Sequence, residues 1–123
     1  MDPKIEAAHT LILTKTPWLQ RRKARAVAEA ADAAILPGEV VKAVGCAGLT
    51  PMVVLTDRRV LSVWGRHTRA VSLSGLTQVR EREGKSVKAK GAGGRVDLVR
   101  DGGMPRELWI GSEIARAVGR AEV

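Results

Sequence analysis

Two short apolar runs separated by a polar turn constrain this chain more than any other feature of its sequence. The runs cover residues 52–55 and 60–64, and Thr-Asp-Arg-Arg (residues 56–59) lies between them. Runs rich in β-branched residues on either side of such a turn predict a β-hairpin. Asp57 suits the turn because an Asp side chain can accept a hydrogen bond from the backbone two residues further on.

The hairpin is predicted to be apolar on both faces. With Asp57 and Arg58 as the turn, Leu55 faces Val60, Val54 faces Leu61, and Val53 faces Ser62. One face then carries Val53, Leu55, Val60 and Trp64, and the other carries Met52, Val54, Leu61 and Val63. An antiparallel hairpin usually exposes one polar face to water. We therefore expect a core against one face and a covering element against the other.

Two helices are predicted before the hairpin. Asp2 and Pro3 are a typical helix start, because Asp caps the first backbone N–H groups and Pro fits the first helical position. Apolar side chains then recur at helical spacing, at Ile5, Ala8 and Ile12. The second helix should cover residues 17–34, with an apolar stripe made by Leu19, Ala26, Val27, Ala30 and Ala34. We expect residues 1–36 to form a helical hairpin packed on the remainder, residues 37–123.

Beyond the Leu-Pro-Gly turn at residues 36–38 the apolar period changes to two. Besides the hairpin, strands are predicted over residues 39–47, 69–73, 76–83, 85–90, 95–100 and 107–110. Turns are expected at residues 91–94 and, as a hairpin signal, at Asp-Gly-Gly, residues 101–103. A closing helix should start with Ser112 as its N-cap and bury Ile114, Ala117 and Val118. The predicted fold class is α+β, mainly β, with the strands in a barrel or sandwich.

The segments Leu-Pro-Gly-Glu (residues 36–39) and Val-Leu-Thr-Asp-Arg-Arg-Val-Leu (residues 54–61) resemble those of bacterial pleckstrin-homology-like (PH-like) domains. The later order, with Val-Ser-Leu at residues 71–73 and glycine-separated strands before a C-terminal helix, is similar, so the resemblance covers residues 36–118. It implies a seven-stranded, partly open barrel capped by that helix. It implies little chemistry, because PH-like folds serve lipid binding, peptide binding and oligomer formation alike. The loop at residues 45–51 carries no charge, whereas phosphoinositide-binding PH domains place basic residues there, so headgroup binding in that pocket is not expected.

The net charge of +8, from 21 basic and 13 acidic residues, favours an acidic partner. Nucleic acid, an anionic membrane surface and an acidic protein all qualify, and a purely compositional origin of the charge is the alternative. The chain lacks Phe and Tyr, so its few aromatic residues disfavour a model built on base stacking. A single cysteine, a start without the pattern of a signal peptide and the absence of a long apolar run favour a cytoplasmic protein.

Catalytic and metal-binding motifs are absent from the sequence. The segment Val-Ser-Leu-Ser-Gly (residues 71–75) is not a nucleophile elbow. His9, His67 and Cys46 lack the spacing of a zinc site. The glycine-rich residues 91–94 lack the Lys-Ser/Thr that completes a phosphate loop. We expect no enzymatic activity, no metal, no cofactor and no small-molecule substrate.

Two groups of basic residues, one in the hairpin turn and one on later strands, are candidate contacts. Arg58 and Arg59 could form an anion-binding hairpin tip. We favour a structural role instead, either as a solvated turn or with one Arg bonding backbone carbonyls within the barrel. A basic stripe is the second group and comprises Arg80, Arg82, Lys88 and Lys90, tempered by Glu81 and Glu83. Its alternative is an ordinary solvated face with a protected strand edge.

A third candidate lies on the second helix, where Trp18 neighbours Arg21, Arg22 and Arg25. An exposed Trp in a basic helical face is typical of an interfacial membrane contact, and a nucleic-acid contact is also possible. Trp is usually well buried, however, so we expect Trp18 to pack on the first helix or the barrel.

These features together predict a non-catalytic PH-like interaction module that binds a protein partner or itself, as a homo-oligomer. Self-association is suggested by the adjacent Leu11, Ile12 and Leu13, and by an Ala-rich second helix that permits close helix approach. The alternative function is a basic adaptor for nucleic acid or an anionic membrane surface. Salt separates the two, because phosphate contacts weaken steeply as salt rises.

Overall fold

The computed structural model describes residues 1–82, 84–91 and 94–121, and these residues form a helix pair, seven strands and a closing helix. Helix α1 covers Pro3–Leu13, and α2 covers Arg21–Ala34 after a 3-10 turn at Trp18–Gln20. The strands are β1 Val41–Cys46, β2 Met52–Thr56, β3 Arg59–Val63, β4 Thr68–Ser72, β5 Leu76–Arg82, β6 Ser86–Gly91 and β7 Gly94–Val99. Helix α3 covers Gly111–Ala121. The predicted fold class, α+β with mainly β structure, is confirmed.

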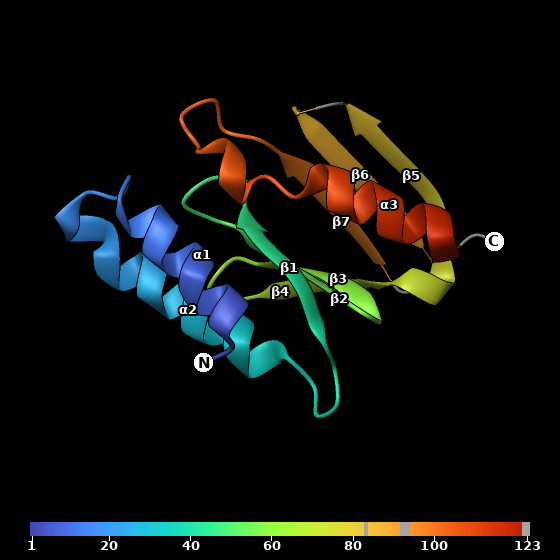
Figure 1. Ribbon diagram of the computed structural model, residues 1–123, viewed down its shortest axis with the longest axis horizontal. Coiled ribbons are helices and arrows are strands. Elements are labelled where there is room, and N and C mark those ends of the chain that lie inside the picture. The colour runs from blue at the N-terminus through green and yellow to red at the C-terminus, as the bar shows by residue number, and fades with distance from the viewer. Residues whose placement is uncertain (83, 92–93, 122–123) are drawn as a thin grey trace.

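The strands form two antiparallel sheets, one of β1–β4 and one of β5–β7, each in sequence order. Strand β4 lies next to β7, and α3 packs on β5. Figure 1 shows the helix pair at one end of the molecule and the three-stranded sheet with α3 at the other. This is a PH-like strand layout, preceded by two helices that pack on β1, β2 and β3.

The central hairpin has the predicted register and the predicted double burial. Leu55 pairs with Val60, Val54 with Leu61, and Val53 with Ser62. The first core, which the helix pair covers, contains Met52, Val54, Leu61 and Val63; the second, between the two sheets and α3, contains Val53, Leu55 and Val60. Trp64, predicted to join the second face, is instead exposed after the strand ends, and its ring stacks on His67 with centroids 5.9 Å apart.

Helix α1 follows its prediction, whereas α2 buries a different face. The Asp2 side chain accepts a hydrogen bond from the Lys4 backbone N–H, and Ile5, Ala8 and Ile12 are buried. The buried face of α2 consists of Ala24, Val27, Ala28 and Ala31. Of the predicted stripe only Val27 belongs to it; Leu19 and Ala26 are exposed, and Ala30 and Ala34 are half-buried. The error is a rotation of about 100°, one helical residue, because Leu19, which anchored the predicted stripe, lies outside α2.

Three predictions near the C-terminus are wrong: the strand over residues 107–110, the hairpin turn at residues 101–103 and Ser112 as a helix N-cap. Residues 107–110 do not form a strand, because a 3-10 turn at Arg106–Leu108 packs there on β1. The Leu108 carbonyl oxygen lies so close to Gly45 that any residue other than glycine at position 45 would clash with it through its Cβ. The turn at residues 101–103 joins no two strands; instead, the Asp101 N–H donates to the Ala47 carbonyl oxygen at 2.7 Å.

Ser112 is not the N-cap of α3, since the helix already includes Gly111 and the Ser112 hydroxyl donates to the Glu81 carboxylate at 3.3 Å. Ile114 is buried and Ala117 packs against the second core, as expected. The side chain of Val118 and the middle of the predicted turn, residues 92–93, lie outside the described part of the chain.

Candidate functional site

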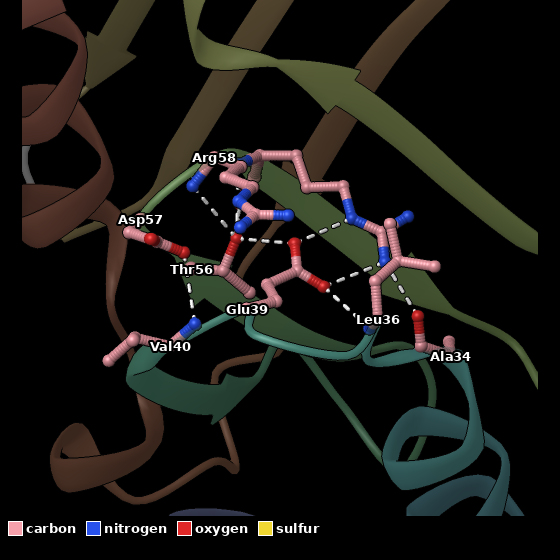
Figure 2. A network of polar contacts seen from close by, with 8 residues as sticks. Ala34, Leu36, Glu39, Val40, Thr56, Asp57 and Arg58 are labelled. Atoms are coloured by element: carbon pink, nitrogen blue, oxygen red, sulfur yellow. Dashed lines mark hydrogen bonds and ion pairs between the residues drawn. The ribbon is translucent and has the colours of Figure 1, made fainter.

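Arg59 belongs to a polar cluster that joins the end of α2 to the central hairpin. Its guanidinium donates to both oxygens of the Glu39 carboxylate, with N···O distances of 2.7 and 2.9 Å. It also donates to the Ala34 carbonyl oxygen at 2.6 Å (Figure 2). The Glu39 side chain is 0% exposed and that of Arg59 is 21% exposed. Such a bidentate ion pair fixes the relative orientation of the two side chains in addition to pairing their charges.

Further hydrogen bonds complete the surroundings of Glu39. The Leu36 N–H donates to one carboxylate oxygen at 3.0 Å, and the Thr56 hydroxyl donates to the other at 2.8 Å (Figure 2). The hydrogen bonds from Arg59 are the main reason why the pKa of Glu39 falls from 4.5 to about 2, although burial acts in the opposite direction. The same contact raises the pKa of Arg59. Glu39 therefore stays ionised in the folded protein.

The hairpin turn is held by hydrogen bonds within the chain. The Thr56 hydroxyl oxygen accepts from the backbone N–H groups of Arg58 and Arg59, at 3.1 and 3.0 Å. The Asp57 carboxylate accepts from the Val40 N–H at 3.0 Å (Figure 2). The Arg59 side chain thus bonds the Glu39 carboxylate and a backbone carbonyl oxygen within the chain. Arg58 keeps an exposed side chain.

The predicted basic stripe comes together on the outer face of the three-stranded sheet. Arg80 pairs directly with Lys88, and Lys90 with Gln78. The next strand adds two residues that sequence reasoning missed, because Lys90 pairs with Arg95 and Lys88 with Asp97. We define the basic sheet face as Arg80, Arg82, Lys88, Lys90 and Arg95. A shallow depression of about 240 Å³ lies over it, lined by Gln78, Arg80, Lys88, Lys90, Arg95 and Asp97.

Among the described residues, one carboxylate lies on this face. Glu81 lies on the opposite face of β5, where it pairs with the buried Val87 and contacts Ser112 of α3. Glu83 lies outside the described residues. Asp97 does lie on the basic sheet face, and its carboxylate forms an ion pair with Arg95 at 2.6 Å. The residue two positions on, Val99, is 71% exposed.

The expected burial of Trp18 is wrong. Trp18 is 77% exposed and its neighbour Leu19 is 75% exposed, because both lie in the 3-10 turn that precedes α2. Arg21 and Arg22 are exposed nearby, and Arg25 forms an exposed ion pair with Glu29 at 2.9 Å. Trp18, Arg21, Arg22 and Arg25 are therefore all accessible at the start of α2.

No family model, curated protein or solved structure matches this chain. In the described residues, no cluster of three or more His, Cys, Asp or Glu side chains could hold a metal ion. Every helix within residues 1–82, 84–91 and 94–121 is too short or too polar to cross a bilayer. Burial raises the pKa of the Cys46 thiol to about 12, so this cysteine stays protonated near neutral pH.

Proposed function

We propose that this chain is a non-catalytic PH-like interaction module that binds an acidic protein partner through its basic sheet face. The supporting observation is that five cationic side chains gather on the outer face of three adjacent strands, on which the one described carboxylate is paired with Arg95. Such a field attracts an acidic partner and speeds its association.

The dimensions of the face suit a short extended segment. Its side chains form three rows two residues apart, at about 3.4 Å per residue, on strands about 4.8 Å apart, so the face measures about 14 by 10 Å. Val99 offers an exposed apolar contact at one end of β7. Burying an apolar side chain in this way adds affinity that does not depend on salt.

Nucleic acid fits this face less well than an acidic protein does. Proteins that bind single strands combine a positive groove with aromatic side chains on which the bases stack. The sequences of β5, β6 and β7 contain no aromatic residue. A nucleic-acid contact would therefore rest on phosphates alone.

Charge reversal at two directly paired residues tests the proposal. We expect the Arg80→Glu, Lys88→Glu variant to bind a fluorescent Glu-rich peptide at least about tenfold more weakly than the parent at low salt, because each substitution turns an attraction into a repulsion. Both side chains are exposed, so the fold should tolerate the changes. The measurement is fluorescence anisotropy at two salt concentrations, and the affinity of the parent should fall as salt rises.

The matched control reverses two exposed lysines elsewhere, Lys4→Glu with Lys42→Glu, and should leave most of the affinity intact. Equal peptide binding by the Arg80→Glu, Lys88→Glu variant and the parent would contradict the proposal. A single-stranded oligonucleotide serves as the competing probe. Binding of the oligonucleotide without binding of the peptide would assign the face to nucleic acid instead.

Self-association is the second candidate, and the exposed Val99 on an edge strand favours it. In the helix pair, Ile12 is buried, Leu13 packs against the first core and the Ala-rich face of α2 is covered, so of the three adjacent apolar residues only Leu11 stays exposed. We expect any homo-oligomer to hold or strengthen as salt rises, because the charge of +8 separates identical chains at low salt. Light scattering at about 100 µM, where a contact of about −5.5 kcal/mol is half formed, measures this. A monomer at both low and high salt would rule it out.

A further inference from the structure

Two neighbouring apolar side chains project from the connection between α1 and α2. Trp18 and Leu19 are more exposed than any other large apolar side chains in the described part of the chain. A Trp side chain has a large apolar surface, and both the ring and the adjacent Leu side chain stay in contact with water here. The exposed pair thus marks a site for a partner of apolar character.

All charged residues close to this pair in the sequence are basic. Residues 7–28 contain no Asp or Glu, and five cations lie within them: Lys15, Arg21, Arg22, Lys23 and Arg25. All five are exposed, and Arg25 forms an exposed ion pair with Glu29, the first acidic residue after this stretch. We define the helical tip as Trp18 and Leu19 together with these five cations. Apolar side chains surrounded by cations complement a surface that has an apolar interior and negatively charged groups at its boundary with water.

We propose that the helical tip docks on an anionic lipid bilayer, with Trp18 and Leu19 inserted at the level of the headgroups. Trp favours this interface because its ring is apolar and its N–H is polar. The surrounding Lys and Arg side chains bind anionic headgroups electrostatically. A phosphate backbone would use the cations but would leave Leu19 in water, so nucleic acid fits this tip less well.

The local structure presents the pair in a fixed conformation. The buried Thr16 hydroxyl donates to the Ile12 carbonyl oxygen at 2.7 Å, which ties the connection to the end of α1. The Gln20 N–H donates to the Pro17 carbonyl oxygen at 2.8 Å and closes the 3-10 turn. Because the turn is already ordered, insertion carries little additional cost in conformational entropy.

This inference goes beyond the proposed function, because it concerns a different surface and a different class of partner. The helix pair and the three-stranded sheet lie at opposite ends of the molecule (Figure 1). A chain that is bound to lipid through the helical tip would keep its basic sheet face available. The module would then connect a bilayer to an acidic protein.

Vesicle binding by the full chain tests the inference. We expect the parent to co-sediment with vesicles of 70% phosphatidylcholine and 30% phosphatidylglycerol, and to bind pure phosphatidylcholine at least about tenfold more weakly. Binding should shift the Trp emission to the blue. We expect the Trp18→Ala, Leu19→Ala variant to lose at least about tenfold in binding, together with that shift. Arg21→Glu with Arg22→Glu should have a comparable effect on binding.

Two control variants separate this site from the other surfaces. Leu36→Ala with Val40→Ala removes two exposed apolar side chains away from the tip and should bind vesicles as the parent does. Arg80→Glu with Lys88→Glu should also bind vesicles as the parent does, although it loses the acidic peptide. Peptide binding by the basic sheet face and vesicle binding by the helical tip are therefore tested independently.

Three outcomes would overturn the inference. If the parent protein does not bind the anionic vesicles, there is no lipid contact. Equal binding by the Trp18→Ala, Leu19→Ala variant excludes insertion and leaves only surface electrostatics. Loss of vesicle binding in the Arg80→Glu, Lys88→Glu variant, but not in the tip variants, would place the lipid contact on the basic sheet face.

Discussion

Replacing Glu39 with Gln is expected to lower the free energy of unfolding by about 3 kcal/mol at pH 7, because Arg59 would lose the carboxylate that neutralises it. A carboxyl pKa that falls from 4.5 to about 2 on folding corresponds to a stabilisation of this size. Urea denaturation of the parent and the variant measures the difference. Glu29→Gln is the matched control, since the ion pair with Arg25 is exposed and should contribute little.

The same carboxylate predicts a specific pH dependence. Because folding lowers the pKa of Glu39, its contribution is complete above the pKa of 4.5 in the unfolded chain and is lost as the pH falls towards about 2. The difference in stability between the parent and Glu39→Gln should therefore shrink between about pH 5 and pH 2. A difference that stays constant over this range would contradict the assignment of the low pKa to Glu39.

Placing a charge on either face of the central hairpin should be the most damaging single change in the chain. Val54 lies in the first core and Leu55 in the second, and both side chains are buried. Val54→Asp and Leu55→Asp should each cost at least about 4 kcal/mol, because each places a carboxylate among apolar side chains without a partner. A loss of this size approaches the whole stability of a small domain. Thermal denaturation followed by circular dichroism should show an early transition or an unfolded chain.

Leu19→Asp is the control for this pair, because Leu19 precedes α2 and is exposed. It should melt close to the parent. The result for the two core variants is informative separately. If only Val54→Asp melts early, the second core does not depend on the hairpin; if only Leu55→Asp does, the helix pair covers less of the sheet than the structure shows.

The parts of the fold that sequence predicted best are those fixed by local pattern. The hairpin register followed from the Thr-Asp-Arg-Arg turn, and α1 followed from Asp2 and Pro3. The buried face of α2 did not follow, because alanines contribute little to an apolar stripe and tertiary packing decides which of them are covered. Residues 107–110 were misassigned because nothing local shows that Leu108 packs against Gly45, far away in the sequence.

The candidate sites divide in the same way. The pairing of Arg80 with Lys88 was predictable from two strands joined near Gly84, whereas Arg95 enters only through the third strand. Alternation along β7, in which Arg95, Asp97 and Val99 share one face, was the signal that could have found it. Trp18 was misjudged because the average burial of Trp outweighed a local 3-10 turn. The partnership of Glu39 with Arg59 spans 20 residues, and no helical or strand period connects them.

The double burial of the central hairpin leaves the pairing of its two strands poorly determined by hydrophobicity. In a sheet with one wet face, sliding one strand by a single residue exposes apolar side chains and is strongly opposed. Here such a slip would move the Val, Leu and Met side chains of one strand from one core to the other, and most of them would stay buried. Thr56 and Arg59 carry the information that the apolar residues lack, because their hydrogen bonds to Glu39 form only in the observed alignment. The ion pair between Glu39 and Arg59 thus selects one strand alignment among several that would bury similar amounts of apolar surface.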